Sequence, residues 1–380
     1  MRLLCCTDTY PPEVNGVAVV TALSLEGLAA RGWDVAFVTG ARENGAAPTA
    51  IKRTTYPSVP VPIYPELRIA LVRGATIEHA ARAFAPDLIH CATEFVVGRH
   101  GLRAAERLDI PAVTSYHTNF ARYTRSYGLG FIERSIEASI TRFHRRARRT
   151  YTPSAPSREY LRALGVPNVE VWGRGVDLRL FRPAKKSAEL RRTLGIGHAF
   201  AFLHVGRLAA EKDIPRILEA FRLVQESEGQ ASVRLIVAGR GPVERDLRRA
   251  APDGVTFLGA LDRARELPAL YASADAFVFA SLTETLGLVV LEAMASGLPV
   301  IAIPAGGVAD HLRDGENGIA VPQGDAEAMA RAMRAMVHDH ALRQRLARGA
   351  VATAAHLDWE RELDRLDVSY RMVLEHRNGH

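Results

Sequence analysis

Two glutamates in one apolar segment could bind different parts of an extended ligand. The segment ETLGLVVLEAMASGLPVIA, residues 284–302, follows a strand-like run, and its residues 285–288 stand where a helix should begin. Backbone N–H groups at a helix start attract a diphosphate. Glu284 lies just ahead of the predicted helix, and Glu292 lies inside it. Glutamates at this spacing are often solvated, but a carboxylate within VVLEAMA should be buried with a partner.

Two cations follow another strand-like run. In HVGRLAAEKD, residues 204–213, Arg207 and Lys212 stand on either side of the entry to a helix. Cations at this place would neutralise a diphosphate and its departing negative charge. The alternative is an ordinary surface pair. Against it, the chain holds only four lysines among its 49 basic residues, so a lysine here is unusual for this composition.

A glycine and a histidine complete the candidate site. The loop TDTYPPEVNGVA, residues 7–18, ends at Asn15-Gly16 before a helix, and glycine lets the backbone approach a phosphate or sugar closely. A tight turn would explain the same residues. His117 ends the strand-like run 112–117 and should face the ligand, although a lone histidine is more often structural than catalytic.

Short apolar runs alternate with longer helical segments along the whole chain, which is typical of parallel sheets covered by helices on both faces. The runs are 2–7, 34–40, 87–92, 112–117, 201–206, 234–239, 255–259, 276–281 and 299–303. The pattern restarts near residue 200 after a stretch rich in proline, lysine and glycine. We therefore expect an α/β protein with two doubly wound domains facing a cleft, in which a ligand binds at the carboxyl ends of the strands.

The predicted domains are residues 1–182 and 183–356. A final helix of mixed charge, residues 357–380, could cross back to the first domain. The length of 380 residues and a composition that is 48% hydrophobic and 24% charged fit a globular protein with two cores.

Cysteine content and hydropathy bear on where the protein works. Cys5, Cys6 and Cys91 are too few for a disulfide framework, and we expect a reducing, cytoplasmic location. The N-terminus lacks the pattern of a signal peptide, and no stretch reaches the roughly 20 apolar residues that a membrane span needs. Membrane contact, if any, is therefore expected to be peripheral, on the inner membrane face.

The net charge of +7 comes entirely from the N-terminal half. Residues 1–180 carry 23 basic and 16 acidic side chains, whereas residues 181–380 carry 26 of each. The densest part, 134–149, is predicted to be a helix whose end is crowded with arginines. It could be a solvated face or attract an anionic lipid surface. Nucleic-acid binding is not expected, because zinc-finger spacing, an aromatic sheet motif and a second basic cluster are missing from the sequence.

The combination of motifs resembles the retaining glycosyltransferases of the GT-B fold classed as family 4. Glu284 and Glu292 match the family's Glu-x7-Glu element, and residues 206–212 match its Gly-Arg and Glu-Lys element. The segments 237–242 and 305–325 are similar to its glycine turn and later loop. YPPEVNGVA, SYHTNFARY and WGRGVD are most similar to GDP-mannose-dependent α-mannosyltransferases and to sulfoquinovosyl or glucosyl transferases that act on lipids.

This resemblance implies a role for each candidate residue. Glu284 and His117 would contact the transferred sugar, and Glu292 would hold the ribose hydroxyls. The other expected donor contacts are Gly16, Arg207, Lys212 and the amides of Thr285, Leu286, Gly287 and Leu288 at the diphosphate, Gly239 in the glycine turn, and Leu261 and Arg265 at the base. The chain departs from the family at Asn15, Arg240 and Asp310, where glycine, aspartate and glutamate are usual.

The reaction implied is transfer of a hexose, with mannose from GDP-mannose as first choice, to a lipid or glycolipid acceptor with retention of configuration. The sequence has no Asp-x-Asp arrangement, so we expect neither a metal nor another cofactor. The alternatives are a UDP-sugar-dependent transferase of the same fold, a nucleotide-sugar epimerase, a non-catalytic nucleotide-sugar sensor and, least favoured because lysines are few, a phosphorylase that uses pyridoxal phosphate.

Overall fold

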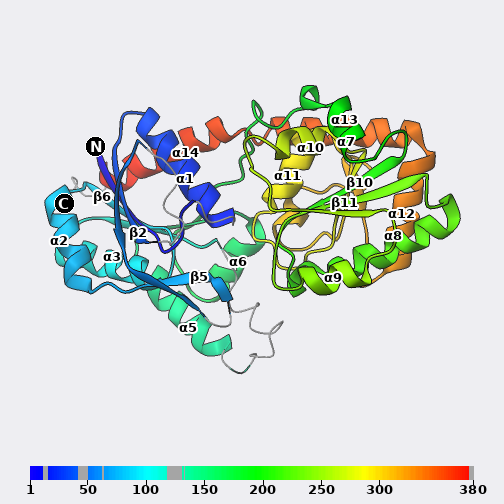
Figure 1. The fold of residues 1–380 in the computed structure, drawn as a ribbon. Coiled ribbons are helices and arrows are strands. Elements are labelled where there is room, and N and C mark those ends of the chain that lie inside the picture. The colour runs from blue at the N-terminus through cyan, green and yellow to red at the C-terminus, as the bar shows by residue number, and fades with distance from the viewer. Residues whose placement is uncertain (12–15, 42–49, 62–63, 118–130, 132, 376–380) are drawn as a thin grey trace. The chain divides into compact units, whose positions relative to one another are not determined.

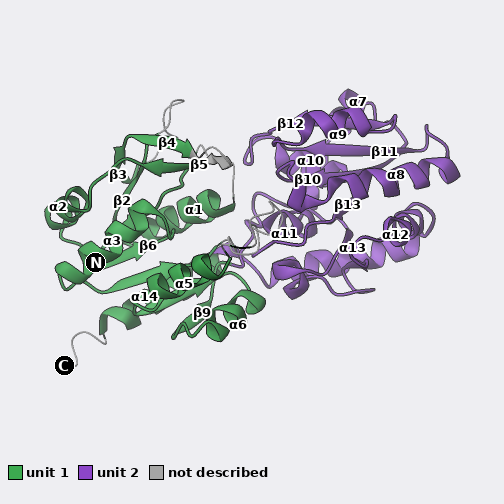
Figure 2. Ribbon diagram, turned by 90° about the horizontal axis from the view of Figure 1, so that it is seen from below, with its two compact units in different colours: residues 1–173, 360–380 green, residues 174–359 purple. Residues whose placement is uncertain are grey.

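A computed structural model describes residues 1–11, 16–41, 50–61, 64–117, 131 and 133–375. The chain forms two compact units (Figures 1 and 2). Unit 1 consists of Met1–Gly173 and Glu360–His380, and unit 2 of Arg174–Trp359. Within the described residues, no helix is long and apolar enough to cross a membrane.

Unit 1 is built on a parallel sheet of seven strands in the order β3-β2-β1-β6-β7-β8-β9. The strands are β1 (Arg2–Cys6), β2 (Asp34–Gly40), β3 (Lys52–Tyr56), β6 (Leu88–Cys91), β7 (Ala112–Ser115), β8 (Arg149–Thr152) and β9 (Val169–Val171). The helices are α1 (Gly16–Ala30), α2 (Gly74–Phe84), α3 (Val96–Arg107), α5 (Glu133–His144), α6 (Ala155–Ala163) and α14 (Trp359–Glu375). An antiparallel pair, β4 (Ser58–Val61) and β5 (Tyr64–Ala70), stands beside the main sheet.

Unit 2 has a parallel sheet of six strands in the order β12-β11-β10-β13-β14-β15. The strands are β10 (Phe200–Val205), β11 (Val233–Ala238), β12 (Val255–Gly259), β13 (Ala276–Phe279), β14 (Val300–Ala302) and β15 (Gly318–Ala320). The α-helices are α7 (Ala188–Thr193), α8 (Ile214–Glu228), α9 (Glu244–Ala250), α10 (Leu267–Ser273), α11 (Leu288–Ala295), α12 (Ala326–His338) and α13 (His340–Ala355). Three short 3₁₀ turns are η2 (Pro183–Lys185), η3 (Ala210–Lys212) and η4 (Gly306–Asp310).

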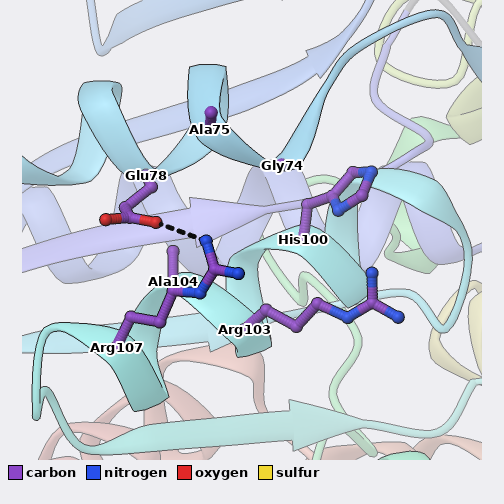
Figure 3. A pocket seen from close by; sticks show the side chains of 7 residues that line it. All are labelled: Gly74, Ala75, Glu78, His100, Arg103, Ala104 and Arg107. Atoms are coloured by element: carbon purple, nitrogen blue, oxygen red, sulfur yellow. Dashed lines mark hydrogen bonds and ion pairs between the residues drawn. The ribbon is translucent and has the colours of Figure 1, made fainter.

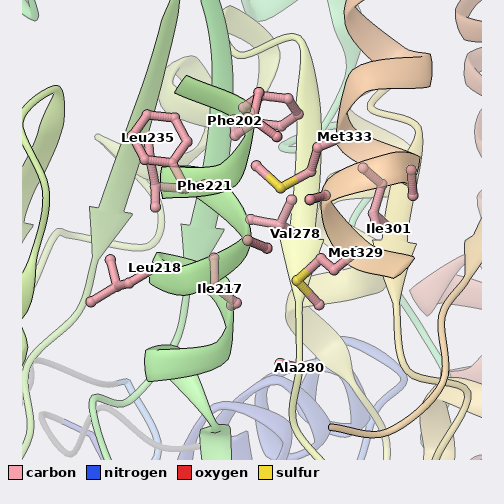
Figure 4. Packing of buried hydrophobic residues seen from close by; sticks show 14 of the residues in the cluster. Phe202, Ile217, Leu218, Phe221, Leu235, Val278, Ala280, Ile301, Met329 and Met333 are labelled. Carbon is pink, nitrogen blue, oxygen red and sulfur yellow. The ribbon is translucent and has the colours of Figure 1, made fainter. Parts of the chain in front are cut away.

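The core of unit 2 explains why its strands are continuously apolar. Helices α8 and α12 pack side by side on one face of the sheet (Figure 1). Phe221 of α8 and Met333 of α12 are fully buried against Phe202 and Val278 of the strands (Figure 4). Helix α10 lies on the other side of the same strands, where Tyr271 packs near Phe277. Strands covered on both faces have no solvent side for polar residues.

Each sheet has one place where the strand order reverses. In unit 2, β10 lies between β11 and β13, so the connections that leave β10 and β13 diverge at their carboxyl ends. In unit 1, β1 lies between β2 and β6 in the same way. Ligands of doubly wound sheets bind at such points, because the diverging loops leave a crevice between them.

The fold class predicted from the sequence is confirmed: both sheets are parallel and doubly wound. All nine apolar runs coincide with strands. Sequence reasoning did not find β3, β8, β9, β15 or the β4–β5 pair. These strands are short, polar or at sheet edges, where β3 exposes most of its KRTTY side chains.

The basic helix expected over 134–149 was too long. Helix α5 ends at His144, and Arg149 already belongs to β8. Arg146 lies in the turn between them and forms a bidentate ion pair with Glu106. The apolar spacing was correct, since Ile140 and Phe143 are buried. The strand's backbone pairing to β7 overrides the helical pattern of the arginines.

The segment after Gly173 joins unit 2 earlier than the division expected at residues 182 and 183. Phe181 is fully buried, and its ring packs at 5.7 Å from the ring of Tyr271 on α10. Val176 bridges to Asp358 within the same unit. Side-chain packing therefore sets this boundary, and the proline- and lysine-rich stretch that follows does not.

The helix α14 packs on unit 1 from Glu360 onward. The indole N–H of Trp33 donates to Asp367 Oδ1 at 2.6 Å, and that of Trp172 donates to the carbonyl oxygen of Glu362 at 2.6 Å. The hydroxyl of Tyr370 lies 2.7 Å from His90 Nδ1. Buried polar contacts as well as apolar packing thus fix this helix to the sheet.

Candidate active site

Lys212 and Glu284 meet at the point of unit 2 where the strand order reverses. Lys212 ends η3 in the loop after β10, and Glu284 lies in the loop after β13. The Lys212 ammonium group and Glu284 Oε1 form an ion pair. Their side chains are 12% and 18% exposed, so the pair is screened from water yet reachable. Two residues that are 72 positions apart are brought together because β10 and β13 are neighbours.

Arg207 lies in the same loop but has a different carboxylate partner. Its Nη1 is 3.4 Å from Glu211 Oε1, and Glu211 is buried. The Arg207 side chain is 16% exposed. The sequence pattern included Glu211 only as part of a motif. In the structure, the Glu211 carboxylate pairs with the Arg207 guanidinium and holds one end of it in place.

The loop 284–288 is held in shape by a close contact with η4. Gly307 N donates to the carbonyl oxygen of Glu284 at 2.7 Å. A Cβ at Gly306 would lie 2.0 Å from that carbonyl oxygen, and one at Gly307 would lie 2.3 Å from the carbonyl oxygen of Thr285. These glycines are therefore required by the approach of the two loops.

The loop 284–288 ends as the start of α11. Gly287 is its N-cap residue with φ of 74°, a conformation that favours glycine. Leu286 and Gly287 are buried, whereas Thr285 and Leu288 are partly exposed. The helix begins where the sequence predicts it, and its positive end adjoins Glu284 of the Lys212–Glu284 pair.

Glu292 is buried on α11 and has two partners that sequence reasoning missed. Its exposed fraction is 2%. Arg263 Nε donates to its Oε1 at 2.7 Å, and the Tyr271 hydroxyl donates to its Oε2 at 3.2 Å. Burial raises the pKa of the Glu292 carboxyl, while Arg263 and Tyr271 oppose that rise. The apolar residues around Glu292 in the sequence indicated that it needs a partner, but they did not indicate where in the chain that partner lies.

Leu261 and Arg265 flank Arg263 in the loop after β12. Leu261 is partly exposed and Arg265 is exposed. The backbone N–H of Arg265 donates to Asp262 Oδ1 at 2.8 Å. Arg263 instead turns inward, with its guanidinium 5.0 Å from the ring centre of Phe181. The inward-facing cation of this loop is therefore Arg263, two positions before the predicted Arg265.

Gly239 lies beside the Arg207 loop and has a structural reason to be glycine. Its φ is 140°, and a Cβ there would lie 1.8 Å from the carbonyl oxygen of Gly206. The neighbouring Arg240 carbonyl accepts a hydrogen bond from Leu208 N at 2.9 Å. The glycine turn thus fits against the loop that carries Arg207, which leaves its backbone next to the candidate diphosphate site.

His117 follows β7 in unit 1, at the carboxyl end predicted for it. Its side chain is partly buried. Burial and the neighbouring His144 lower its pKa to about 4. The imidazole of His117 is therefore uncharged at neutral pH, which suits a hydrogen bond to a sugar hydroxyl.

Gly16 is the first residue of α1 and is exposed. A Cβ added to it would meet nothing within 4 Å. The fold of the described residues therefore gives no steric reason for glycine here. Asn15, its neighbour in the predicted loop, lies outside the described residues.

Two features of the described residues bear on other ligands. These residues contain no group of three or more His, Cys, Asp or Glu side chains that could hold a metal ion. A cavity of about 260 Å³ opens between α2 and α3, lined by Glu78, His100, Arg103 and Arg107 among others (Figure 3). None of the candidate site residues lines it.

Two family models match this chain. Residues 14–180 match Glycosyltransferase Family 4, and residues 199–339 match Glycosyl transferases group 1. A GDP-mannose-dependent alpha-mannosyltransferase of Mycobacterium tuberculosis is 33% identical over 378 residues, which is 98% of this chain and 97% of that protein. The chain belongs to glycosyltransferase family 4. The similarity of this glycosyltransferase to that relative therefore extends over nearly the whole of both chains.

Two further comparisons define its neighbours. The alpha-monoglucosyldiacylglycerol synthase of Streptococcus pneumoniae is 33% identical to this glycosyltransferase over 80% of its chain and 71% of that protein. The solved structure of Anabaena Alr3699/HepE in complex with UDP-glucose superimposes with a TM-score of 0.79 at 20% identity, covering 98% and 100% of the two chains. The likeness to solved glycosyltransferases identifies the fold as GT-B, as predicted.

Proposed function

We propose that this glycosyltransferase moves mannose from GDP-mannose to a lipid or glycolipid acceptor, with retention at the anomeric carbon and without a metal. The observation that carries the proposal is the Lys212–Glu284 pair at the positive end of α11. It offers a cation for a diphosphate and a carboxylate for sugar hydroxyls in one place. Full-length similarity to a GDP-mannose-dependent enzyme supports the choice of donor.

Each candidate residue has a role in this proposal. Lys212 and Arg207 neutralise the departing diphosphate together with the amides of 285–288, a fixed positive potential that can contribute ~3 kcal/mol per donor. Glu284 and His117 bind the transferred sugar, and Glu292 receives the ribose hydroxyls. The acceptor oxygen attacks the anomeric carbon on the face that the diphosphate leaves. The carbon–oxygen bond to phosphate breaks as the new one forms, and a donor phosphate oxygen takes the acceptor's proton.

A thermal-shift panel tests the donor. The ligands are GDP, UDP, ADP, GDP-mannose, UDP-glucose and UDP-glucuronate, because a ligand at 100 times its dissociation constant adds ~2.7 kcal/mol to stability. Stabilisation by GDP and GDP-mannose alone is expected. Stabilisation by UDP compounds would replace the donor and keep the site, and no response to any nucleotide would overturn the proposal.

Product analysis separates the remaining alternatives. We expect a mannosylated lipid only when donor and acceptor are both present, and the same rate with and without a chelator. A new sugar formed from the donor alone would indicate an epimerase. Tight nucleotide binding without turnover would indicate a sensor.

A cationic surface on unit 1 supports the lipid acceptor. Arg99, Arg103 and Arg107 recur every four residues along α3. The charges of Arg103, Arg142 and Arg146 all act to lower the pKa of Arg99, so arginines of α3 lie near those at the end of α5. The positive charge that the sequence placed on one helix is therefore shared by two elements, which makes a broader surface for anionic lipid.

Sedimentation with liposomes tests this surface. We expect binding to vesicles with anionic lipid at low salt and release as salt rises, because exposed charges are screened. Replacing exposed Arg103 with glutamate should weaken binding, whereas the same change at exposed Arg345 of unit 2 should not. The lack of binding at low salt would contradict the anionic-surface part of the proposal.

A further inference from the structure

A buried carboxylate and a buried imidazole lie behind the sheet edge that carries His117. Glu94 follows β6 at the place where the strand order of unit 1 reverses. It is 6% exposed, and its Oε1 is 3.3 Å from Nε2 of His144, which is fully buried at the end of α5. Neither residue belongs to the motifs assigned above. A buried pair of this kind is costly to assemble, and it is weak evidence of stabilisation by itself.

His144 makes a hydrogen bond and a ring contact to the segment that ends in His117. Its Nδ1 is 2.9 Å from Thr114 Oγ1, and Thr114 Oγ1 is in turn 3.0 Å from Thr150 Oγ1 of β8. The His144 ring packs edge-to-face on Tyr116 with ring centres 5.8 Å apart. These two contacts fix Thr114 of β7 and Tyr116 just after it, and both residues closely precede His117 in the chain. A displacement of His144 would therefore move His117.

Glu94 also has neighbours on its other sides. Its carbonyl oxygen accepts a hydrogen bond from Arg99 Nε on α3 at 2.7 Å. Its negative charge raises the pKa of Asp8, which follows β1 and caps α3 through Val97 N at 2.9 Å. Thr93 Oγ1 donates to Asp8 Oδ2 at 2.6 Å. The loop that carries Glu94 is thus tied to α3 directly through Arg99 and indirectly through Asp8, so Glu94 is a fixed support for His144.

The electrostatic surroundings of His117 agree with the geometry. The charge of His144 on α5 lowers the pKa of His117, with burial the larger cause. His90 on β6 is close enough for His117 to lower its pKa in turn, and burial takes the pKa of His90 to about 3. His90 is held by Ser115 Oγ and the Tyr370 hydroxyl, both at 2.7 Å. His117 is therefore close enough to His144 and His90 for their charges to interact, and this proximity adds to burial in favouring its uncharged form.

We propose that Glu94 and His144 are positioning residues of the transfer reaction: Glu94 orients His144, and His144 holds the Thr114–Tyr116 segment so that the uncharged imidazole of His117 is presented to the transferred sugar. This inference rests on the proposed function only in the identity of the group that His117 meets. The pair itself touches neither donor nor acceptor.

The test compares His144→Phe with Ile140→Ala on the same helix. Phenylalanine keeps a ring against Tyr116 and removes the bonds to Glu94 and Thr114, whereas the control removes buried apolar volume and leaves both bonds in place. We expect His144→Phe to lower kcat by roughly 10- to 100-fold, as misplacement of a positioned group does. The KM for GDP-mannose should change by less than about threefold, because the diphosphate groups are on unit 2. Ile140→Ala should keep kcat per folded molecule.

A conservative series separates orientation from mere packing. Glu94→Gln keeps an oxygen that can accept from His144, and Glu94→Ala removes it. Glu94→Gln should retain most of the activity and Glu94→Ala should resemble His144→Phe. Equal activity of Glu94→Ala and wild type, or a kcat loss in Ile140→Ala as large as that in His144→Phe, would overturn the proposal.

A second readout does not depend on turnover. In an NMR titration of the His117 ring, burial should keep the pKa below 6.5 in His144→Phe, but the pKa should lie above the wild-type value of about 4, because the smaller of its two lowering causes, the charge of His144, is gone. An unchanged His117 titration together with unchanged kcat would overturn the positioning role and leave the transferase proposal intact. A shifted titration in a protein that transfers no mannose would keep the positioning role and overturn the proposed donor.

Discussion

The carboxyl edges of the two sheets differ in how exposed their charged and polar side chains are and in what these side chains contact, although both sheets are parallel and doubly wound. In unit 2, Lys212, Glu284 and Arg207 are partly exposed; Lys212 pairs with Glu284 across two loops, and Arg207 pairs with Glu211 within one loop. In unit 1, His90, His144, Glu94 and Asp8 are buried and held by neighbouring hydroxyls, imidazoles and backbone N–H groups. One edge offers charge to a ligand, and the other uses polar groups to hold its own loops.

Under the proposed function, this difference would follow from what each edge contacts. A diphosphate brings its own negative charge, so cations beside it must be reachable and can be paired with carboxylates until it arrives. An uncharged sugar hydroxyl needs a fixed, neutral hydrogen-bonding group, and burial provides one by keeping an imidazole unprotonated. The same sheet topology therefore supports two kinds of recognition.

Removing the partner of Glu292 should give the largest effect. Arg263→Met removes the ion-pair partner of the buried Glu292 carboxylate and leaves the hydrogen bond from the Tyr271 hydroxyl. Loss of one member of a buried ion pair costs about 3–5 kcal/mol of stability. Chemical denaturation of Arg263→Met and of the exposed control Arg265→Met measures this. Equal stability of the two variants would mean that Glu292 is not held as a buried ion pair.

Replacing the lysine of the Lys212–Glu284 pair should abolish most turnover. Lys212→Ala removes a cation from the leaving group, and loss of one such donor lowers kcat by about 10²–10³-fold. The control is Lys185→Ala on exposed η2. Turnover of Lys212→Ala near that of the control would contradict leaving-group stabilisation by unit 2.

Acid should destabilise both units through their buried histidines. His90 in unit 1 has a pKa of about 3 and His204 in unit 2 one of about 4, both lowered by burial from 6.5. The unfolded chain therefore binds more protons below pH 6.5, so the free energy of unfolding falls as pH drops toward 4. Each histidine contributes about 1.4 kcal/mol per pH unit in this window.

Single variants isolate each contribution. His204→Phe and His90→Phe should each reduce the slope of unfolding free energy against pH between 6.5 and 5 by about that amount. Urea denaturation at several pH values gives the slope. A variant with the wild-type slope would show that its histidine is protonated in the folded protein, and the burial argument for that unit would fail.

Substitution of Gly16 should have the smallest effect of these variants, and it distinguishes a role in donor binding from a role in the fold. Gly16→Ala meets no steric obstacle in the described residues, so its thermal stability should equal or exceed that of wild type. Its affinity for GDP-mannose should fall by about tenfold if the backbone approaches the donor phosphate there. Unchanged affinity, measured by calorimetry, would remove Gly16 from the donor site.

The position of Glu292 illustrates how far the sequence reaches. Its apolar neighbours required burial and a partner, and both are present. The partner is Arg263, which the sequence did not single out; in the same loop, the family resemblance directed attention to Arg265, and for a different role, as a contact to the base. A loop's side-chain directions depend on φ and ψ at each residue, so a difference of two positions decides whether an arginine faces inward or faces water.

The Lys212–Glu284 pair also shows what the sequence does not predict, which is the contact between residues whose separate positions it does predict. The sequence placed each residue after a strand, because strand ends are visible as the end of an apolar run. Their contact depends on β10 and β13 being neighbours in the sheet, an order that local patterns do not encode. His144 is a clearer case still, since its bonds to Glu94 and Thr114 join three separate elements.

The sequence by itself determined that this protein has two parallel doubly wound sheets and which loops follow their strands, because burial on both faces of a strand and glycine at close approaches leave local signatures. The tertiary structure decided which charges pair, where α5 stops, where unit 2 begins and which buried groups support His117. Those outcomes depend on strand order and on packing between residues far apart in the chain, and no periodicity within one segment records them.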